Sequence, residues 1–198
     1  MPALVYTGPI ALRFDPAAPI PVPGPGEVLV RVVAVGICGS DMHAYHGHDS
    51  RRPAPLILGH EAAGFVCGGP RDGQRVTIDP LVTDPDGPEA RAGRAHLSPG
   101  RQIISMPPHP GAFAGFVTIP ERNLHVVPDS LTLDQAALCE PVAVSWHALK
   151  QGLRLLGDLP ALTMVQGGGA IGLAAALCAR HLAGDMWLLS NPMQHAAR

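Results

Sequence analysis

A cysteine, a histidine and two carboxylates stand in this 198-residue sequence where they could bind one metal ion together. Cys38 lies in the glycine-flanked segment GICGSDMH, and His60 and Glu61 lie in the segment GHEAAG. Glu140, in the segment CEP, offers a further ligand far along the chain. A thiolate, an imidazole and a carboxylate form the mixed set that a catalytic zinc ion uses when it keeps one coordination position open. The pattern therefore predicts one catalytic zinc site.

Each of these side chains also has a simpler structural interpretation. A single cysteine such as Cys38 is often a small buried hydrophobic residue, and His60 with Glu61 could form a surface or core hydrogen bond. Cys139 could take the ligand role beside Glu140, although its apolar neighbours favour packing. We favour zinc because all of these ligands occur together within glycine-rich turns.

Three histidines close to Cys38, namely His43, His46 and His48, could suggest a second metal site. We favour a catalytic part for His43. We expect His46 and His48 to line the mouth of a cleft or to face solvent.

A second chemical motif is the glycine-rich loop GGGAIG, in which Gly167, Gly169 and Gly172 match the pattern GxGxxG around Ile171. A strand-like segment precedes the loop and a helix-like segment follows it, so free N–H groups at the helix N-terminus could face a pyrophosphate. The simpler alternative is a turn that lets strand and helix pack closely. The residue that binds the ribose should follow the second strand, where Asn191 stands, and Asn191 leaves the choice between NAD and NADP open.

Short strands must position the metal ligands. The sequence has 23 glycines and 22 prolines, and strands separated by such turns predict a small barrel. Asp41 can cap a short helix that runs through Tyr45. The predicted strands cover residues 3–6, 10–14, 28–35, 62–67, 75–78, 113–119 and 124–127.

Helical spacing of apolar residues begins near Thr132 and is expected to be broken by Pro141. Residues 162–166 and 186–190 then form buried-type strands around a helix over 170–183, which is one βαβ unit. We therefore predict a mixed β and α/β protein, with a barrel over residues 1–141 and the start of a dinucleotide-binding domain over 142–198.

Composition excludes several classes of function. The net charge is −2 and the basic residues are scattered, so we expect no nucleic-acid partner. The longest apolar run is too short to span a bilayer, and the N-terminus lacks the pattern of a signal peptide. The four cysteines have no C-x-x-C spacing, which favours a reducing cytoplasm over a disulfide framework.

Taken together, these motifs resemble the zinc-containing medium-chain alcohol and polyol dehydrogenases, of the sorbitol and L-idonate dehydrogenase type. The resemblance implies a GroES-like barrel as the catalytic domain, followed by the first βαβ unit of a Rossmann domain. It implies Cys38 and His60 as zinc ligands, Glu61 as an alternating ligand or neighbouring carboxylate, and Glu140 as the third protein position. Glu followed by Pro is typical of the polyol-type members.

The resemblance also implies the reaction. The zinc ion would lower the pKa of a substrate alcohol and stabilise the alkoxide, while a hydride passes to NAD or NADP. Ser40 would accept the proton and pass it through the cofactor ribose toward His43 and water. Ser40 and Asp41 can in addition cap a helix. The expected partners are a small alcohol, polyol or sugar-acid substrate and, as an option, further copies of the chain.

Many members of this family carry a second, structural zinc ion in a lobe with the spacing C-x2-C-x2-C-x7-C. The four corresponding positions here are occupied by Asp84, Gly87, Ala90 and Ser98. Because glycine and alanine have no ligand atom, we expect no structural zinc and a looser lobe.

Family members are nearly twice as long and build a six-stranded Rossmann sheet, whereas this sequence reaches two of those strands. We therefore expect a truncation within the Rossmann domain and impaired activity of the isolated chain. One rival hypothesis is a non-catalytic zinc-binding remnant, or a subunit that needs a partner chain. A second rival is a zinc-free quinone or enoyl reductase with the same fold.

Overall fold

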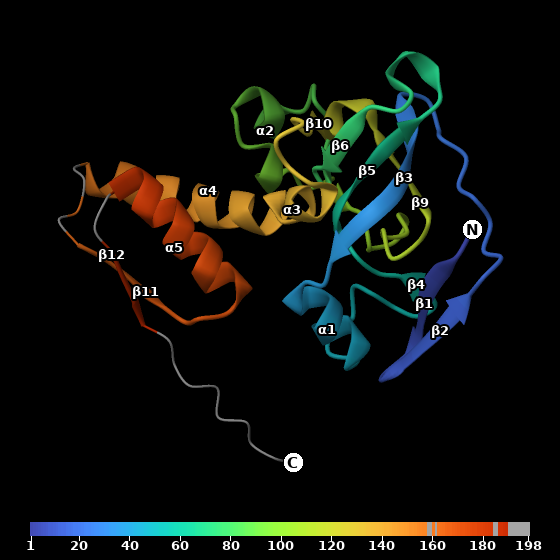
Figure 1. The fold of residues 1–198 in the computed structure, drawn as a ribbon, viewed down its shortest axis with the longest axis horizontal. Helices are drawn as coiled ribbons and strands as arrows, with labels where there is room; N and C mark the ends of the chain where they lie inside the picture. Colours follow the sequence, from blue (N-terminus) through green and yellow to red (C-terminus); the bar gives the residue numbers. More distant parts are fainter. Residues whose placement is uncertain (158–159, 161, 184–185, 190–198) are drawn as a thin grey trace. The chain divides into compact units, whose positions relative to one another are not determined.

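Contacts in the computed structural model divide the chain into two units, Met1–Leu138 and Cys139–Arg198 (Figure 1). The structure describes residues 1–157, 160, 162–183 and 186–189. The predicted boundary after Pro141 lies inside the first helix of the second unit, because that helix already begins at Cys139.

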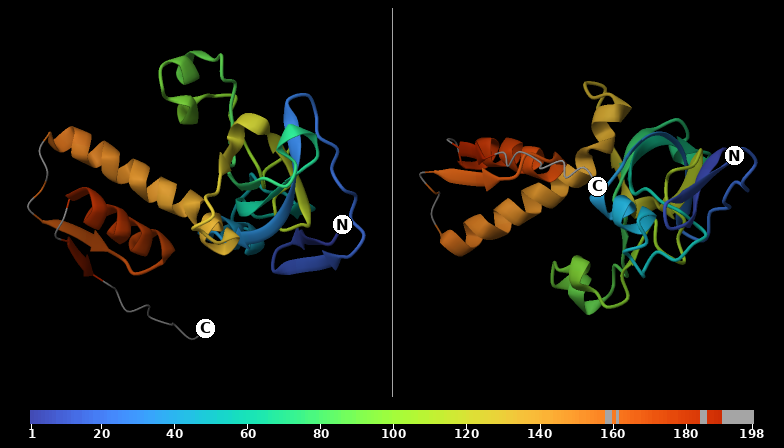
Figure 2. Two further views of the ribbon diagram at one scale, coloured as in Figure 1. Left: turned by 45° about the horizontal axis from the view of Figure 1, so that its top comes forward. Right: turned by 90° about the horizontal axis from the view of Figure 1, so that it is seen from below.

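A five-stranded antiparallel sheet in the order β10-β6-β5-β3-β9 forms the body of the first unit. It curls into an open barrel around a core that includes Val30, Val76 and Ile119, all of which are almost completely buried (Figure 2). β-branched residues fill this interior because they pack well on a pleated surface. The strands are β3 (Glu27–Gly36), β5 (Glu61–Cys67), β6 (Arg75–Ile78), β9 (Phe116–Pro120) and β10 (Leu124–Val126).

Two smaller sheets complete the first unit. One has the strand order β2-β1-β4, and the other pairs β7 with β8. Three of these strands have only two residues, which is too short for the alternation that identifies a strand in a sequence. The strands are β1 (Ala3–Gly8), β2 (Ala11–Asp15), β4 (Leu56–Ile57), β7 (Leu81–Val82) and β8 (Gln102–Ile103).

The register between β3 and β5 brings together the two segments that are predicted to bind the metal. Gly36, the last residue of β3, pairs with Glu61, the first residue of β5. The chain therefore leaves β3 toward Cys38 at the point where His60 leads into β5. Helix α1 (Gly39–Tyr45) follows Cys38 directly.

The predicted interruption of a helix at Pro141 is wrong. Helix α3 (Leu133–Ala137) ends before it, and α4 (Cys139–Leu156) begins at Cys139 and runs through Pro141. Proline is tolerated in the first turn of a helix, because the N–H group that it lacks would have no partner there. The break lies instead at Leu138, between the two helices.

The second unit contains the predicted βαβ unit. Strands β11 (Thr163–Gln166) and β12 (Met186–Leu189) are parallel, and α5 (Ala170–Ala183) connects them. Helix α4 packs against α5, and the Ser145 hydroxyl donates a hydrogen bond of 3.3 Å to the Ile171 carbonyl. The predicted mixed β and α/β class is confirmed. No helix in the described part of the chain is long and apolar enough to cross a membrane.

Candidate metal centre

Cys38, His60 and Glu61 form one compact group of potential metal ligands. A sulfur, a ring nitrogen and a carboxylate oxygen, one from each residue, all lie within 4.8 Å of one another. His60 and Glu61 are each 6% exposed, and Cys38 is half-buried between β3 and α1. Among the described residues, no other three histidine, cysteine or acidic side chains approach one another in this way.

Glycines leave the space that this group occupies. The Glu61 carboxylate lies over the Cα of Gly36, where an added Cβ would clash with Oε2. Gly59 precedes His60 with a φ of +89°, and a Cβ there would stand 2.7 Å from the Phe113 ring. A side chain at either position would therefore displace a candidate ligand or the turn that carries it.

The carboxylate of Asp41 connects the two segments that carry the candidate ligands. Its Oδ2 accepts a hydrogen bond of 3.0 Å from the Cys38 N–H, and its Oδ1 accepts one of 3.1 Å from the Gly59 N–H. Oδ1 also lies 3.7 Å from His60 Nδ1, an ion-pair distance. The sequence suggested Asp41 only as a helix cap. Asp41 is the third residue of α1 and is 2% exposed. An aspartate buried to this extent does more than cap a helix, and here it holds the two segments together.

The surroundings of His60 favour the charged forms of its two neighbours, the Cys38 thiolate and the Asp41 carboxylate. The hydrogen bond with His60 lowers the pKa of Cys38, against burial, which raises it. Burial lowers the pKa of His60, but Asp41 and Cys38 outweigh it and raise that pKa to about 10. Burial raises the pKa of Asp41, but His60 and two backbone N–H groups bring it below its usual value. This pocket stabilises positive charge, as a cation site must.

The other predicted residues near Cys38 lie on or after α1. Ser40 Oγ and His60 Nδ1 are the two buried side-chain N or O atoms without a hydrogen-bond partner in the described part of the chain. His43 is exposed. The ring of His48 lies 6.5 Å from that of His43 and 6.1 Å from that of His46, so the three histidines are neighbours without forming a close ligand group.

Removing the Asp41 carboxylate should weaken both the fold and the metal centre. Asp41→Ala leaves the buried Gly59 N–H and the part-buried Cys38 N–H without acceptors, so we expect a loss of about 3 kcal/mol of unfolding free energy. Zinc affinity should fall about 10- to 100-fold, because the His60 ring loses its orienting partner. Denaturant unfolding and competitive zinc titration measure the two effects. Asp134→Ala, which removes an exposed aspartate from the first turn of α3, is the control; equal effects of the two variants would contradict the prediction.

A buried arginine supports the segment that carries Ser40. Arg52 is 3% exposed, and its Nε donates hydrogen bonds to the carbonyl (2.9 Å) and hydroxyl (3.3 Å) of Ser105. Its Nη1 donates to Asp49 Oδ2 at 2.7 Å and to the Ser40 carbonyl at 3.4 Å. Arg51, which is exposed, pairs with the same aspartate. The two guanidinium groups thereby share the Asp49 carboxylate.

The Asp49 carboxylate should contribute to stability in a defined range of pH. Hydrogen bonds from Arg51 lower the pKa of Asp49 from 3.8 to about 2. A lowered pKa stabilises the folded state above the unfolded value near 4, and this stabilisation disappears as pH falls toward 2. Asp49→Asn should therefore lose about 1–2 kcal/mol at neutral pH and little at pH 2. Chemical unfolding across this range tests it, with the fully exposed Asp129→Asn as control; a pH-independent difference for Asp49→Asn would contradict the prediction.

The remaining predicted residues belong to the second unit. Glu140 is the second residue of α4 and is half-buried. The glycine loop joins β11 to α5, with Gly167 at a φ of +112° and Gly172 packed so closely on the Gly167 carbonyl that a Cβ would clash. Ile171 lies in the first turn of α5. Asn191 lies outside the described residues.

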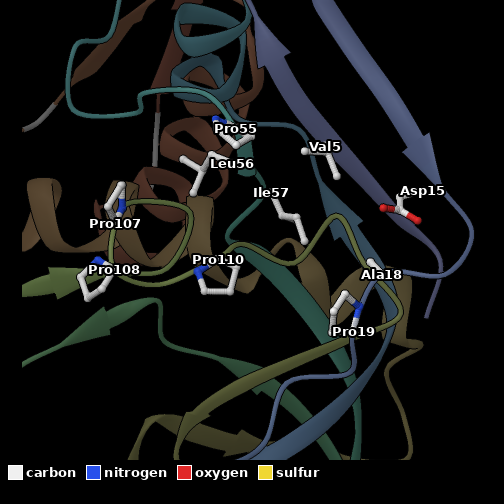
Figure 3. A pocket seen from close by; sticks show the side chains of 10 residues that line it. All are labelled: Val5, Asp15, Ala18, Pro19, Pro55, Leu56, Ile57, Pro107, Pro108 and Pro110. Atoms are coloured by element: carbon white, nitrogen blue, oxygen red, sulfur yellow. The ribbon is translucent and has the colours of Figure 1, made fainter.

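A separate depression of about 430 Å³ lies on the first unit (Figure 3). None of the predicted metal-binding or catalytic residues lines it. Its walls are mostly apolar, with Asp15 as the one charged side chain, so it has no part in the metal chemistry. The lining residues are Val5, Asp15, Ala18, Pro19, Pro55, Leu56, Ile57, Pro107, Pro108 and Pro110.

Comparison with known proteins places this geometry in a family. The alcohol dehydrogenase GroES-like domain matches residues 24–129. Sorbitol dehydrogenase of Macaca fascicularis is 36% identical over 187 residues, which cover 90% of this chain and 51% of that protein. The chain thus spans about half the length of the curated relatives that it matches.

Solved structures share the fold of both units. Alcohol dehydrogenase TADH from Thermus sp. ATN1 superposes with a TM-score of 0.85 at 25% identity, covering 98% of this chain and 59% of that one. Acetophenone reductase from Geotrichum candidum, in complex with NAD, superposes with a TM-score of 0.83 at 26% identity over 98% of this chain and 58% of its own. The predicted GroES-like barrel and the start of a Rossmann domain are confirmed.

Proposed function

Because the chain belongs to the family of the alcohol dehydrogenase GroES-like domain, we propose that it is the catalytic part of a zinc-dependent, NAD(P)-linked alcohol or polyol dehydrogenase. The observation that carries this proposal is the group of Cys38, His60 and Glu61, whose ligand atoms lie within 4.8 Å of one another. A half-buried thiolate with a buried imidazole and a buried carboxylate matches the ligand chemistry of a catalytic zinc ion.

Each ligand has a defined part in holding the ion. Cys38 binds as the thiolate, which its lowered pKa already favours. His60 Nδ1 faces Asp41, so we assign Nε2 to the metal, in the way that a neighbouring carboxylate usually fixes a ligating imidazole. Glu61 supplies the carboxylate within the first unit. Glu140 of the second unit is proposed as a further ligand, on the basis of the family resemblance.

The chain's own residues would handle the proton. When bound, the zinc ion supplies a Lewis acid that lowers the pKa of a substrate alcohol. The Ser40 hydroxyl, which is buried and has no hydrogen-bond partner, would accept the alcohol proton. His43 is exposed on the same helix and would exchange that proton with water. Both residues lie in α1, whose first turn Asp41 fixes to the metal-binding segments.

The glycine loop would hold the dinucleotide. Gly167, Gly169 and Gly172 allow the backbone to approach a pyrophosphate at the N-terminus of α5, and Ile171 belongs to the same turn. The NAD complex of the similar acetophenone reductase supports this assignment. Similarity to sorbitol dehydrogenase supports a polyol as the substrate. The group of Cys38, His60 and Glu61 argues against the alternative of a zinc-free reductase. The other alternative, a zinc-binding remnant without catalytic activity, is tested by measuring whether the protein turns over a polyol with NAD(P).

One zinc ion per chain is the expected stoichiometry. The first unit offers one ligand group, whereas two of the four positions of a structural site are Gly87 and Ala90. Elemental analysis of the purified protein, after dialysis against a weak chelator, should give a zinc-to-protein ratio near one. A zinc-to-protein ratio near two that decreases in the double variant Asp84→Ala, Ser98→Ala would contradict this prediction. A purified protein without zinc would contradict it as well.

A further inference from the structure

The edge of the small N-terminal sheet has the chemistry of a contact between two copies of this chain. Strand β2 is the edge strand of the order β2-β1-β4, and in Figure 1 it lies at the outer side of that sheet. We propose that β2 pairs with β2 of a second copy in antiparallel orientation, about a twofold axis through Phe14. This inference is independent of the proposed dehydrogenase activity.

The backbone of β2 leaves hydrogen-bonding groups at this edge. The Leu4 N–H donates to the Phe113 carbonyl at 2.8 Å, so the backbone groups of Leu4 point away from β2. Phe14 stands directly opposite Leu4 in the register of β1 and β2. In an antiparallel ladder, residues that do not bond each other both turn these groups outward. The N–H and C=O of Phe14 therefore point to the open edge, where they can bond a further strand.

An apolar face runs out to the same edge. Tyr6 and Leu4 of β1 stand opposite Leu12 and Phe14 of β2, and opposite residues share one face of a sheet. Tyr6 is 4% exposed and packs in a cluster of the first unit's core. Leu12 is 46% exposed and Phe14 is 64% exposed. The apolar face thus continues beyond the core that covers Tyr6, and a second β2 would cover Phe14 with its own Phe14.

Charge selects a second copy as the occupant and fixes the register. With the axis through Phe14, Arg13 of each chain stands opposite Asp15 of the other, which gives two cross-strand pairs of opposite charge. An axis through Arg13 would place two arginines opposite each other, and an axis through Leu12 would pair neither charge. Within its own strand, Arg13 now forms a partly exposed ion pair of 3.5 Å with Oδ2 of Asp15. Asp15 Oδ1 accepts a hydrogen bond of 3.0 Å from the Ala17 N–H, so Oδ2 is the oxygen that would turn to the second chain. Asp15 also borders the depression in Figure 3. Because neighbouring residues of a strand point to opposite faces, Asp15 and Phe14 lie on different faces of the sheet.

Charge reversal tests this pairing with the full 198-residue chain. Sedimentation equilibrium should show a weak dimer, because a five-residue edge buries little surface. Arg13→Asp or Asp15→Arg alone places like charges opposite each other and should raise the dimer dissociation constant about tenfold or more. The double variant Arg13→Asp with Asp15→Arg should restore the wild-type constant. Asp129→Arg, which reverses an exposed charge elsewhere, should leave it unchanged.

Three results would overturn the proposal. One is a wild-type chain that stays monomeric at every concentration tested. Another is a dimer that the single reversals leave intact, which would assign association to a different surface. The third is failure of the double reversal to restore a dimer that both single reversals weaken, provided that circular dichroism shows all variants folded.

Discussion

Replacing Cys38 with serine, or His60 with alanine, is expected to lower zinc affinity more than about a hundredfold. Loss of a residue that only orients a ligand costs about 10- to 100-fold, and loss of a ligand should exceed that, because the whole binding energy of a zinc ion is divided among a few protein atoms. The two donors come from separate segments, which meet through the register of Gly36 with Glu61 and through the hydrogen bonds of Asp41. Competitive titration with a chromophoric chelator measures the affinity.

Two further variants separate the metal centre from general stability. Cys67→Ser removes a half-buried thiol from β5, the strand that carries Glu61, but at its far end and outside the ligand group. It should retain the zinc affinity of the wild type. Cobalt substitution adds a spectroscopic check, because a cobalt–thiolate band should be present in the wild type and in Cys67→Ser and absent from Cys38→Ser. Wild-type affinity in both Cys38→Ser and His60→Ala would refute the site.

The main strands could be predicted from the sequence because they are runs rich in β-branched residues that end at glycine or proline turns. The predicted strand over residues 28–35 corresponds to β3, which covers Glu27–Gly36. The two-residue strand β4 could not be predicted, since its conformation depends on pairing with Val5 and Tyr6 in a distant strand. The prediction that Pro141 breaks a helix was wrong, because Pro141 lies in the first turn of α4. Proline is tolerated in a first turn and also interrupts helices, and the local sequence does not distinguish the two cases.

Residue type was enough to single out Cys38, His60 and Glu61, which the structure brings together, as candidate ligands. It was not enough to single out the residues that support them. Asp41 accepts hydrogen bonds from Cys38 and Gly59, and this depends on the approach of two segments that are separate in the sequence. Arg52 is similar, because its partner Ser105 comes from a third segment. The sequence does not distinguish a buried aspartate or arginine from an exposed one, and these residues are usually exposed. Their burial therefore becomes visible only in the tertiary structure.

The isolated 198-residue polypeptide is expected to oxidise polyols roughly a thousandfold or more slowly than a whole sorbitol dehydrogenase. Hydride transfer requires the nicotinamide to be held against the substrate carbon, and correct positioning supplies much of the rate of such reactions. In the described residues the parallel sheet has two strands, β11 and β12, whereas a dinucleotide lies across the switch point of a larger sheet. The glycine loop alone should therefore bind NAD(P) weakly.

Joining the missing half of a relative tests whether positioning is the cause. A chimaera that continues this chain with the C-terminal half of a sorbitol dehydrogenase should recover NAD(P)-linked turnover, and Cys38→Ser or Ser40→Ala in the chimaera should abolish or strongly reduce it. Recovery that does not depend on Cys38 and Ser40 would assign the chemistry to other residues. Robust turnover by the 198-residue polypeptide itself would contradict the prediction. Such turnover would mean that the polypeptide completes its dinucleotide-binding site by association with another copy. Loss of that turnover in the Arg13→Asp and Asp15→Arg variants would then identify the β2 edge as the contact between the copies.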